Sequence, residues 1–296
     1  MNRLAALVAL VLLTGCPLLF PNAYPTPEQG PEGLGTDRPH AIVIGVSGHP
    51  LSVSQNPNTE NLMHRGTLGT MVEVLSEGNT RLVYAWDHAD AFYSMDSQGN
   101  FLTPFDSADF VSFGFLHLVS DMQFIRDEWV DGVEEPTRVI VVGHSHGVVW
   151  AHIAAMLVPD LPIELMIDID GTVESWDGFG PTGLSVDGFD QVILDYSYTV
   201  NAGWPFEVWM ARDAWEIPGQ SELADIEDVV PANVITNLEI RTEGLLLNDP
   251  DPNVRIDGTS DGIEVFLSGE GHDESANPSS DAMTWVLNYL VYQQSR

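Results

Sequence analysis

Residues 138–147 decide the fold that this sequence predicts; they read Arg138-Val139-Ile140-Val141-Val142-Gly143-His144-Ser145-His146-Gly147. After Arg138 comes a run of aliphatic residues typical of a buried strand, and an apolar stretch of helical length follows at 148–157. Ser145 has a glycine two positions before it and another two positions after it, and a Cβ at either place would crowd the strand or the helix. The segment therefore predicts a strand, a sharp turn with Ser145 at its apex, and a helix.

Strands and helices are expected to alternate on both sides of this turn. Before it, apolar patterns indicate strands at 41–46 and 81–86 and helices at 59–75 and 108–130. After it, they indicate strands at 163–169, 234–241 and 263–267 and a closing helix at 278–292. Such alternation favours an α/β fold, with a mainly parallel sheet flanked by helices.

One long stretch, residues 172–231, does not fit the alternation. It is rich in Gly, Pro, Trp and Asp and has no clear periodicity. Long irregular segments inside compact domains are usually functional or disordered. We therefore expect a single α/β domain over 39–296, with 172–231 forming a lid or cap insertion after the strand that follows the helix of the turn.

The N-terminus is typical of an exported protein. Residues 1–15 contain Arg3 and then an apolar stretch at 4–13, which is too short to span a bilayer and is expected to be a signal peptide. The segment 13–16, Leu-Thr-Gly-Cys, resembles the lipobox of bacterial lipoproteins, in which the cysteine is lipidated and begins the mature chain. Cys16 is the one cysteine of the chain, so it has no internal disulfide partner.

Residues 16–38 contain many prolines and glycines and predict an extended tether between a membrane anchor at Cys16 and the α/β domain. Pro17 stands where an aspartate is associated with retention in bacterial inner membranes. We therefore expect an exported protein that is anchored by lipid to a bacterial membrane, at the outer membrane or the cell surface.

The charge of the chain limits its partners. The formal net charge is −34, and all ten basic residues are arginines. A charge of this sign repels nucleic acid and anionic lipid head groups, so no nucleic-acid partner is expected.

The order of the motifs resembles the α/β-hydrolase fold superfamily over about residues 39–294. The most specific parts are Gly-His-Ser-His-Gly at 143–147 and the strand that leads into Ser-Gly-Glu-Gly-His-Asp-Glu at 268–274. The resemblance implies a serine nucleophile, an acyl-enzyme intermediate and hydrolysis of a carboxylic ester, with lipids among the candidate substrates. It assigns Ser145 as the nucleophile and His272 as the base, in a glycine-flanked loop after the last strand.

Four aspartates are candidates for the acid that orients His272. Asp170 ends the strand after the helix of the turn, as in the lipase-like arrangement, and is the first choice. Asp168 is two residues earlier on the same side of that strand. Asp249 and Asp251 follow a later strand, in a proline-rich loop where they are equally turn formers.

Two main-chain N–H groups are expected to stabilise the oxyanion of the reaction. One belongs to His146, the residue after the nucleophile. The other belongs to the turn Ser47-Gly48-His49, which resembles the His-Gly-x loop of the family with Ser47 in place of histidine. That resemblance implies His49 as the second donor.

Two competing interpretations remain open at this point. Residues 166–172, Met-Ile-Asp-Ile-Asp-Gly-Thr, resemble the first motif of haloacid-dehalogenase-type phosphatases, in which Asp168 would be the nucleophile beside magnesium. The lysine that such enzymes usually place on the phosphate does not exist in this chain. The other alternative is a surface protein that keeps the hydrolase fold for binding alone. For the hydrolase itself the sequence predicts no cofactor and no metal site.

Overall fold

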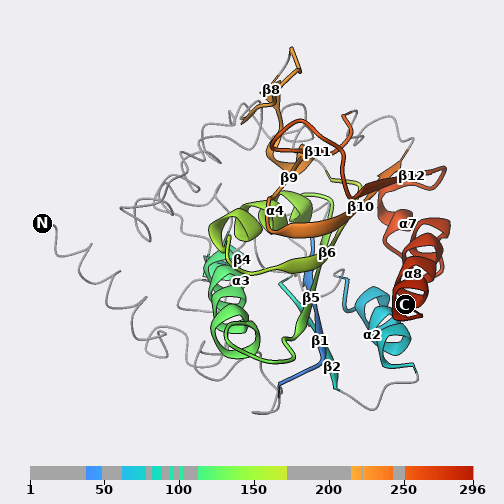
Figure 1. The fold of residues 1–296 in the computed structure, drawn as a ribbon. Coiled ribbons are helices and arrows are strands. Elements are labelled where there is room, and N and C mark those ends of the chain that lie inside the picture. The colour runs from blue at the N-terminus through green and yellow to red at the C-terminus, as the bar shows by residue number, and fades with distance from the viewer. Residues whose placement is uncertain are drawn as a thin grey trace, which may run out of the picture.

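The computed structural model describes residues 38–48, 62–77, 82–88, 94–95, 101–102, 113–171, 215–221, 223–242 and 251–295. Its centre is a six-stranded sheet in the order β12-β10-β6-β5-β1-β2, and every neighbouring pair runs parallel (Figure 1). The strands are β1 (Ala41–Val46), β2 (Val83–Asp87), β5 (Arg138–His144), β6 (Ile163–Ile169), β10 (Val234–Thr242) and β12 (Ile263–Ser268).

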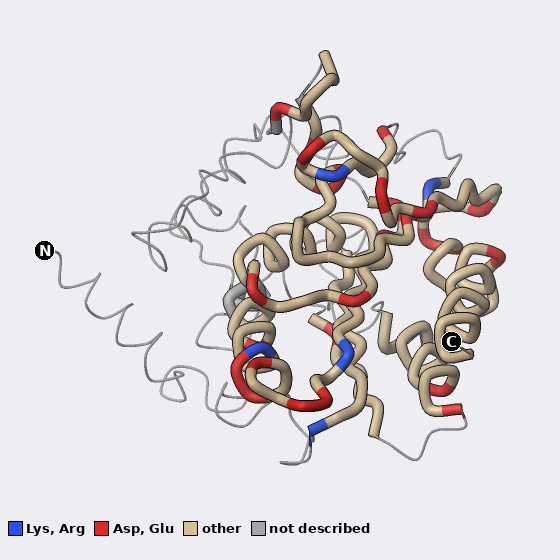
Figure 2. Tube along the Cα trace, viewed as in Figure 1, with Lys and Arg blue, Asp and Glu red and all other residues tan. Residues whose placement is uncertain are grey.

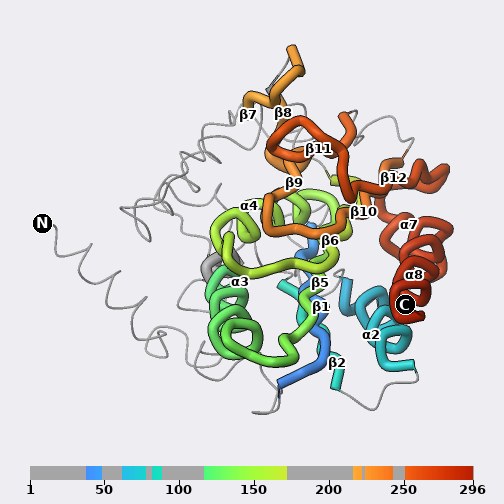
Figure 3. The backbone as a smooth tube through the Cα atoms, viewed as in Figure 1, coloured from blue at the N-terminus to red at the C-terminus, as the bar shows by residue number. Residues whose placement is uncertain are grey.

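Helices cover both faces of this sheet (Figure 1). On one face lie α3 (Phe113–Phe124), its continuation η3 (Ile125–Val130) and α4 (Gly147–Leu157), and on the other lie α2 (Thr67–Ser76) and α8 (Asp281–Gln294). The predicted α/β class, a mainly parallel sheet flanked by helices, is confirmed. The chain colours in Figure 3 show that α2, near the start of the described chain, packs beside α8, near its end.

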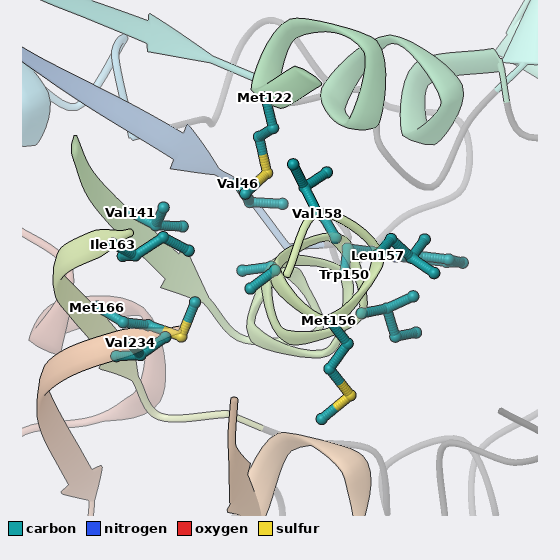
Figure 4. Close-up of a cluster of buried hydrophobic side chains, with 14 of the residues drawn as sticks. Val46, Met122, Val141, Trp150, Met156, Leu157, Val158, Ile163, Met166 and Val234 are labelled. Atoms are coloured by element: carbon teal, nitrogen blue, oxygen red, sulfur yellow. The ribbon is translucent and has the colours of Figure 1, made fainter. Parts of the chain in front are cut away.

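Two apolar layers result from the alternation of side chains along the strands. Ile42, Ile44 and Val46 of β1 point to the α3 and α4 side, whereas Val43 between them points to α2 and α8. Figure 4 shows part of the first layer, with Met122 of α3, Val46 of β1, Val141 of β5 and residues of α4 drawn as sticks. Both faces of the central strands are buried, which explains why β5 reads as a continuous apolar run rather than an alternating one.

The closing helix, predicted at 278–292, shifts slightly to Asp281–Gln294, and two earlier helices differ more from their predicted bounds. The helix expected at 59–75 begins only at Thr67, because residues 63–66 form a turn in which Gly66 has a φ of 86°. That left-handed conformation ends any preceding helix and is accessible to glycine. The helix expected at 108–130 is α3 followed by a turn of π-helix, η3, where the backbone pattern changes although the apolar pattern continues. Residues 59–61 and 108–112 lie outside the described part.

The stretch expected to be an insertion contains part of the core. Ile226, Val229 and Val230 are buried in the same apolar layer as α4. They belong to η4 (Ile226–Asp228) and β9 (Val229–Val230), and β9 pairs with β11 (Val254–Arg255). The last part of the predicted insertion therefore packs in the core and does not form a lid. Residues 172–214, on which the lid prediction now rests, lie outside the described part of the chain.

Four short elements complete the description: β3 (Ser94–Met95) with β4 (Phe101–Leu102), and β7 (Trp215–Glu216) with β8 (Leu223–Ala224). The four-residue helix α7 (His272–Ser275) follows β12 and was not predicted from the sequence.

Within the described ranges, no helix combines the length and the apolar character that crossing a bilayer requires. The predicted signal at 1–15, the lipid attachment site at Cys16 and most of the tether at 16–38 lie outside those ranges.

Candidate active site

Ser145 occupies a strained turn between β5 and α4. Its φ is 57°, a left-handed value that few residues other than glycine adopt. The turn is held by hydrogen bonds from Ser145 N to the Ile169 carbonyl, 3.0 Å, and from Val148 N to the Ser145 carbonyl, 3.0 Å. The serine is thus fixed at the carboxyl end of β5, beside the end of β6.

The two flanking glycines are required by close approach. A Cβ at Gly147 would lie 1.9 Å from the Val46 carbonyl oxygen, and one at Gly143 would lie 2.7 Å from Val148 Cα. Both contacts are with backbone or Cα atoms, which cannot rotate away. The packing expected from the spacing of these glycines is present, and the strand, sharp turn and helix predicted around Ser145 are confirmed.

The turn after β1 lies against Ser145. A Cβ at Gly48 would be 2.5 Å from Ser145 Cβ and 2.6 Å from the His144 carbonyl oxygen. The neighbouring Ser47 is buried, and its hydroxyl donates to both carboxylate oxygens of Asp87, at 2.9 and 3.0 Å, while accepting from Leu62 N at 2.9 Å. Ser47 therefore ties the turn after β1 to β2 and to the turn before α2.

Asp170 is the carboxylate that reaches His272. Its own backbone is strained, with φ at 48°, and its N–H donates to the Ile240 carbonyl at 2.8 Å. The side chain is wholly buried and receives three hydrogen bonds: Thr242 N to Oδ1 at 2.9 Å, Thr242 Oγ1 to Oδ2 at 2.8 Å, and His272 Nδ1 to Oδ2 at 2.5 Å. The two hydrogen bonds from Thr242 hold the carboxylate in a fixed orientation, with Oδ2 facing the imidazole of His272.

His272 begins α7, and several contacts anchor that helix. The Ser275 hydroxyl donates to the His272 carbonyl at 2.8 Å. Arg65 donates to the Asp273 carbonyl at 2.7 Å and pairs with its carboxylate at 3.2 Å. Thr67 donates to the Ala276 carbonyl at 2.5 Å. The turn before α2 thus holds the backbone on which His272 is carried.

The imidazole of His272 has one bonded nitrogen and one available nitrogen. Because a carboxylate can only accept, Nδ1 carries the proton in the bond to Asp170, and neutral His272 then has an unprotonated Nε2. The ring is 14 % exposed. In the described part of the chain neither this Nε2 nor Ser145 Oγ makes a hydrogen bond, and catalytic contacts of this kind often form only with substrate bound.

His144, the residue before Ser145, packs against His272. The ring centroids are 5.0 Å apart at an interplanar angle of 33°, and His144 Nε2 is 3.2 Å from the His272 carbonyl oxygen. Burial, together with the positive charge of His272, lowers the pKa of His144 to about 3. The imidazole of His144 is therefore neutral at neutral pH.

Asp168, the alternative acid, belongs to a different pair. His152 of α4 bonds to Asp168 Oδ2 through Nε2 at 3.0 Å and to the carbonyls of Ile226 and Val229 through Nδ1, both at 3.1 Å. Asn237 and Asn253 also donate to Asp168 Oδ2. Burial acts to lower the pKa of His152, but the charge of Asp168 and these hydrogen bonds raise it overall. Asp168 therefore serves the core, not His272.

The remaining predicted site residues are placed as follows. His146 is buried at the start of α4, with its ring edge-on to Trp150 at 5.6 Å, and its N–H follows Ser145 directly. Asp251 is exposed. His49 and Asp249 lie outside the described part. Among the residues that the structure describes, no group of three or more His, Cys, Asp or Glu side chains could hold a metal ion.

Three contributors were missed at the sequence level: Thr242 on Asp170, Asp87 on Ser47, and Arg65 on α7. Each acts across a large sequence separation that only the strand order creates. The order in which parallel strands pair cannot be read from their apolar patterns, so no local signal identified these three residues.

The comparisons with known proteins add little. No family model matches the chain, and no curated protein does. Among solved structures, Pyrococcus furiosus esterase Pf2001 is 12 % identical with a TM-score of 0.46, over 86 % of this chain and 83 % of that one. A fungal esterase from Rhizomucor miehei is 13 % identical with a TM-score of 0.43, over 90 % and 77 %. Est1E from Butyrivibrio proteoclasticus, with ferulic acid bound, is 14 % identical with a TM-score of 0.38, over 90 % and 92 %. At these values the similarity says nothing about the reaction of this chain.

Proposed function

We propose that this chain is a serine hydrolase that cleaves carboxylic esters through an acyl-enzyme, with Ser145 as nucleophile, His272 as base and Asp170 as the acid that orients it. One observation carries the proposal. The carboxyl ends of β5, β6 and β12 bring together a serine on a strained turn, a buried carboxylate and a histidine bonded to it through Nδ1. The chain order Ser, Asp, His is that of α/β-hydrolases.

In the acylation step, Ser145 Oγ attacks the ester carbonyl carbon while its proton moves to His272 Nε2. The imidazolium that forms is stabilised by Asp170, whose carboxylate faces Nδ1 from a fixed position. Negative charge develops on the carbonyl oxygen, and the His146 N–H is the donor that we assign to it. Collapse of this intermediate breaks the bond to the alcohol, which leaves with the proton from Nε2.

Deacylation repeats the step with water in place of serine. Nε2 takes a proton from water as the hydroxide oxygen bonds to the acyl carbon, and it returns that proton to Ser145 Oγ as the carboxylic acid leaves. The second oxyanion donor that we propose is the N–H of His49, which follows Gly48 in the sequence. The position of Gly48 against Ser145 supports this assignment.

The test is labelling by a fluorophosphonate, which reacts with activated serines, combined with hydrolysis of p-nitrophenyl esters of increasing chain length. Wild-type protein without residues 1–15 should be labelled at Ser145, as mapped by peptide mass spectrometry. Ser145→Ala and His272→Ala should lose both labelling and turnover. Circular dichroism establishes that the variants are folded.

The outcomes separate the candidate functions. Labelling and turnover that depend on Ser145 and His272 support the hydrolase. A folded wild-type protein that is neither labelled nor active would contradict it and would favour the binding protein on a hydrolase fold. Chain-length dependence assigns the substrate class, since preference for long acyl chains would indicate lipid substrates.

The geometry does not favour the phosphatase alternative. A phosphorylated aspartate must be accessible to its substrate, but Asp168 is 3 % exposed and its Oδ2 is bonded to His152, Asn237 and Asn253. A magnesium requirement for hydrolysis of phosphate monoesters, lost in Asp168→Asn, would reverse this conclusion.

We also propose that Cys16 is lipidated after removal of residues 1–15 and anchors the domain to a bacterial membrane through the tether at 16–38. The lipobox-like segment supports this. Wild-type chain expressed in bacteria should incorporate an alkyne fatty acid and fractionate with the membranes, and Cys16→Ala should do neither. Equal incorporation in both would refute the anchor, whereas the hydrolase proposal would be unaffected.

A further inference from the structure

We propose that His144 is a positioning residue for the reaction, holding the main chain and ring of His272 so that Nε2 faces Ser145. This inference rests on the proposed function. His144 touches neither substrate nor Ser145 Oγ in the assigned roles, so it would act through His272 alone.

The contact has a defined direction of hydrogen bonding. A carbonyl oxygen can only accept, so the 3.2 Å contact to the His272 carbonyl places a proton on His144 Nε2. The same carbonyl accepts from Ser275 Oγ at 2.8 Å. The carbonyl oxygen of His272 thus accepts two hydrogen bonds. One comes from His144, the residue before Ser145, and the other comes from Ser275 of α7.

The ring of His144 also limits the ring of His272. Centroids 5.0 Å apart with planes 33° from parallel place one imidazole over part of the other. His272 is fixed at Nδ1 by Asp170, and rotation about that bond remains the motion that would turn Nε2 away. A buried neighbouring ring opposes that rotation.

His144 is suited to this place because it remains uncharged. When His272 takes the serine proton it becomes a cation, and a second cation at this distance would oppose the step. Burial, together with the charge on His272, lowers the pKa of His144 to about 3. A neutral donor ring holds His272 without opposing its protonation.

The turn at Ser145 and the helix α7 are thereby joined directly. His144 is the last residue of β5 and adjoins Ser145, so one short segment of backbone carries both the nucleophile and the contact that places its base. Arg65 and Thr67 hold α7 further along, at Asp273 and Ala276. His144, by contrast, contacts His272 directly, from the end of β5 that precedes Ser145.

The test separates donor from ring. His144→Gln keeps an N–H donor without the ring, His144→Phe keeps a ring without the donor, and His144→Ala removes both. We expect kcat on a p-nitrophenyl ester to fall about tenfold in His144→Gln and His144→Phe and about a hundredfold in His144→Ala, with KM changed less than twofold. The reason is that misplacement of a catalytic group by about 1 Å can lower the rate about 10²-fold. Rates are corrected for the folded fraction.

The matched control is His152→Gln, which removes another buried imidazole that has no contact with His272 in the assigned site. It should lower the melting temperature and leave kcat per folded molecule within twofold. A purely structural role for His144 predicts the same pattern for its variants. Therefore kcat in His144→Ala within twofold of wild type would overturn the inference.

A second readout does not depend on activity. The proton on His272 Nδ1, bonded to Asp170, should give a low-field NMR signal in wild type that is absent or broadened in His144→Ala and retained in His152→Gln. An unchanged signal in His144→Ala would overturn the inference even if the wild type proved inert toward esters. Such inertness would contradict only the proposed function.

Discussion

Two Asp–His pairs lie at the end of one strand, with aspartates two residues apart in the sequence, and the surroundings of the two pairs differ. Asp168 belongs to β6, and Asp170 directly follows its last residue, with φ at 48°. The partner of Asp168, His152, is 0 % exposed and has both ring nitrogens bonded. The partner of Asp170, His272, is bonded through one nitrogen and partly exposed.

The comparison shows what a histidine needs to act as a base. A carboxylate beside an imidazole is present in both pairs, so proximity alone does not mark the site. His152 has no nitrogen left to accept a proton, and its raised pKa favours the charged form. His272 keeps one nitrogen free at the edge of the sheet where Ser145 lies. The free nitrogen, not the Asp–His contact, distinguishes the proposed active site.

The two pairs differ in what they join. Figure 2 shows Asp and Glu at many points of the described chain, with few basic residues between them. The pair at Asp168 joins α4 to β6 and β10 through His152, Asn237 and Asn253. The pair at Asp170 joins the end of β6 to Thr242 at the end of β10 and to His272 at the start of α7.

The largest expected difference comes from making the same substitution in both histidines. His272→Gln should lower kcat/KM for esters by about 10⁴-fold or more, because the base is lost. His152→Gln should leave activity per folded molecule within twofold but reduce the free energy of unfolding by about 3–5 kcal/mol, since it leaves Asp168 buried without its charge partner. Ester hydrolysis and urea denaturation measure the two effects. Equal losses of activity would erase the distinction between the pairs.

The next effect concerns the turn that lies against Ser145. Gly48→Ala places a Cβ 2.5 Å from Ser145 Cβ and should reduce fluorophosphonate labelling by about 10²-fold, since either the turn or the serine must move. Gly69→Ala is the control, because a Cβ there meets no atom within 4 Å and alanine favours the helix by about 1 kcal/mol. Normal labelling in Gly48→Ala would show that the turn yields without disturbing Ser145.

The pH dependence of stability should carry opposite contributions from two buried histidines. The folded-state pKa of His152 lies above 6.5, so its contribution is fully present below pH 6.5 and is lost as the pH rises through the folded value. The folded-state pKa of His144 is about 3 against 6.5, so stability falls as the pH drops from 6.5 toward 3, by at most about 5 kcal/mol.

Urea denaturation at a series of pH values tests this. The difference between wild type and His152→Gln should shrink as the pH rises above 6.5, and the difference between wild type and His144→Phe should change as the pH falls below 6.5. Parallel stability curves for wild type and both variants would contradict the assigned charge states.

The smallest effect is expected at Ser47. Ser47→Ala leaves Leu62 N and the Asp87 carboxylate without the hydroxyl that joins them, which should cost about 1–3 kcal/mol of stability. Because the turn after β1, which lies against Ser145, loses a tether, kcat should fall about three- to tenfold with little change in KM. Ser47→Thr keeps the hydroxyl and serves as the control. Unchanged kcat in Ser47→Ala would show that the turn is held by Gly48 and its backbone alone.

The sequence predicted the parts of the site that depend on local spacing. The strand, turn and helix around Ser145 follow from glycine positions and apolar runs, and all are present. Choosing between Asp168 and Asp170 required the three-dimensional structure, because the sequence places both at the end of one predicted strand. His152 of α4 is hydrogen-bonded to Asp168, and that contact depends on how α4 packs against the sheet. The predicted start of the helix at 59–75 was wrong for a local reason. Gly66 adopts a left-handed conformation, which an apolar pattern does not reveal.

The most direct measurement is the rate of fluorophosphonate labelling at Ser145 in wild type, Asp170→Asn and Asp168→Asn, corrected for the folded fraction of each. If Asp170 alone orients the base, labelling should slow by about 10³- to 10⁴-fold in Asp170→Asn and by less than threefold in Asp168→Asn. Wild-type labelling retained in Asp170→Asn, or lost equally in both variants, would contradict the assignment of the catalytic pair.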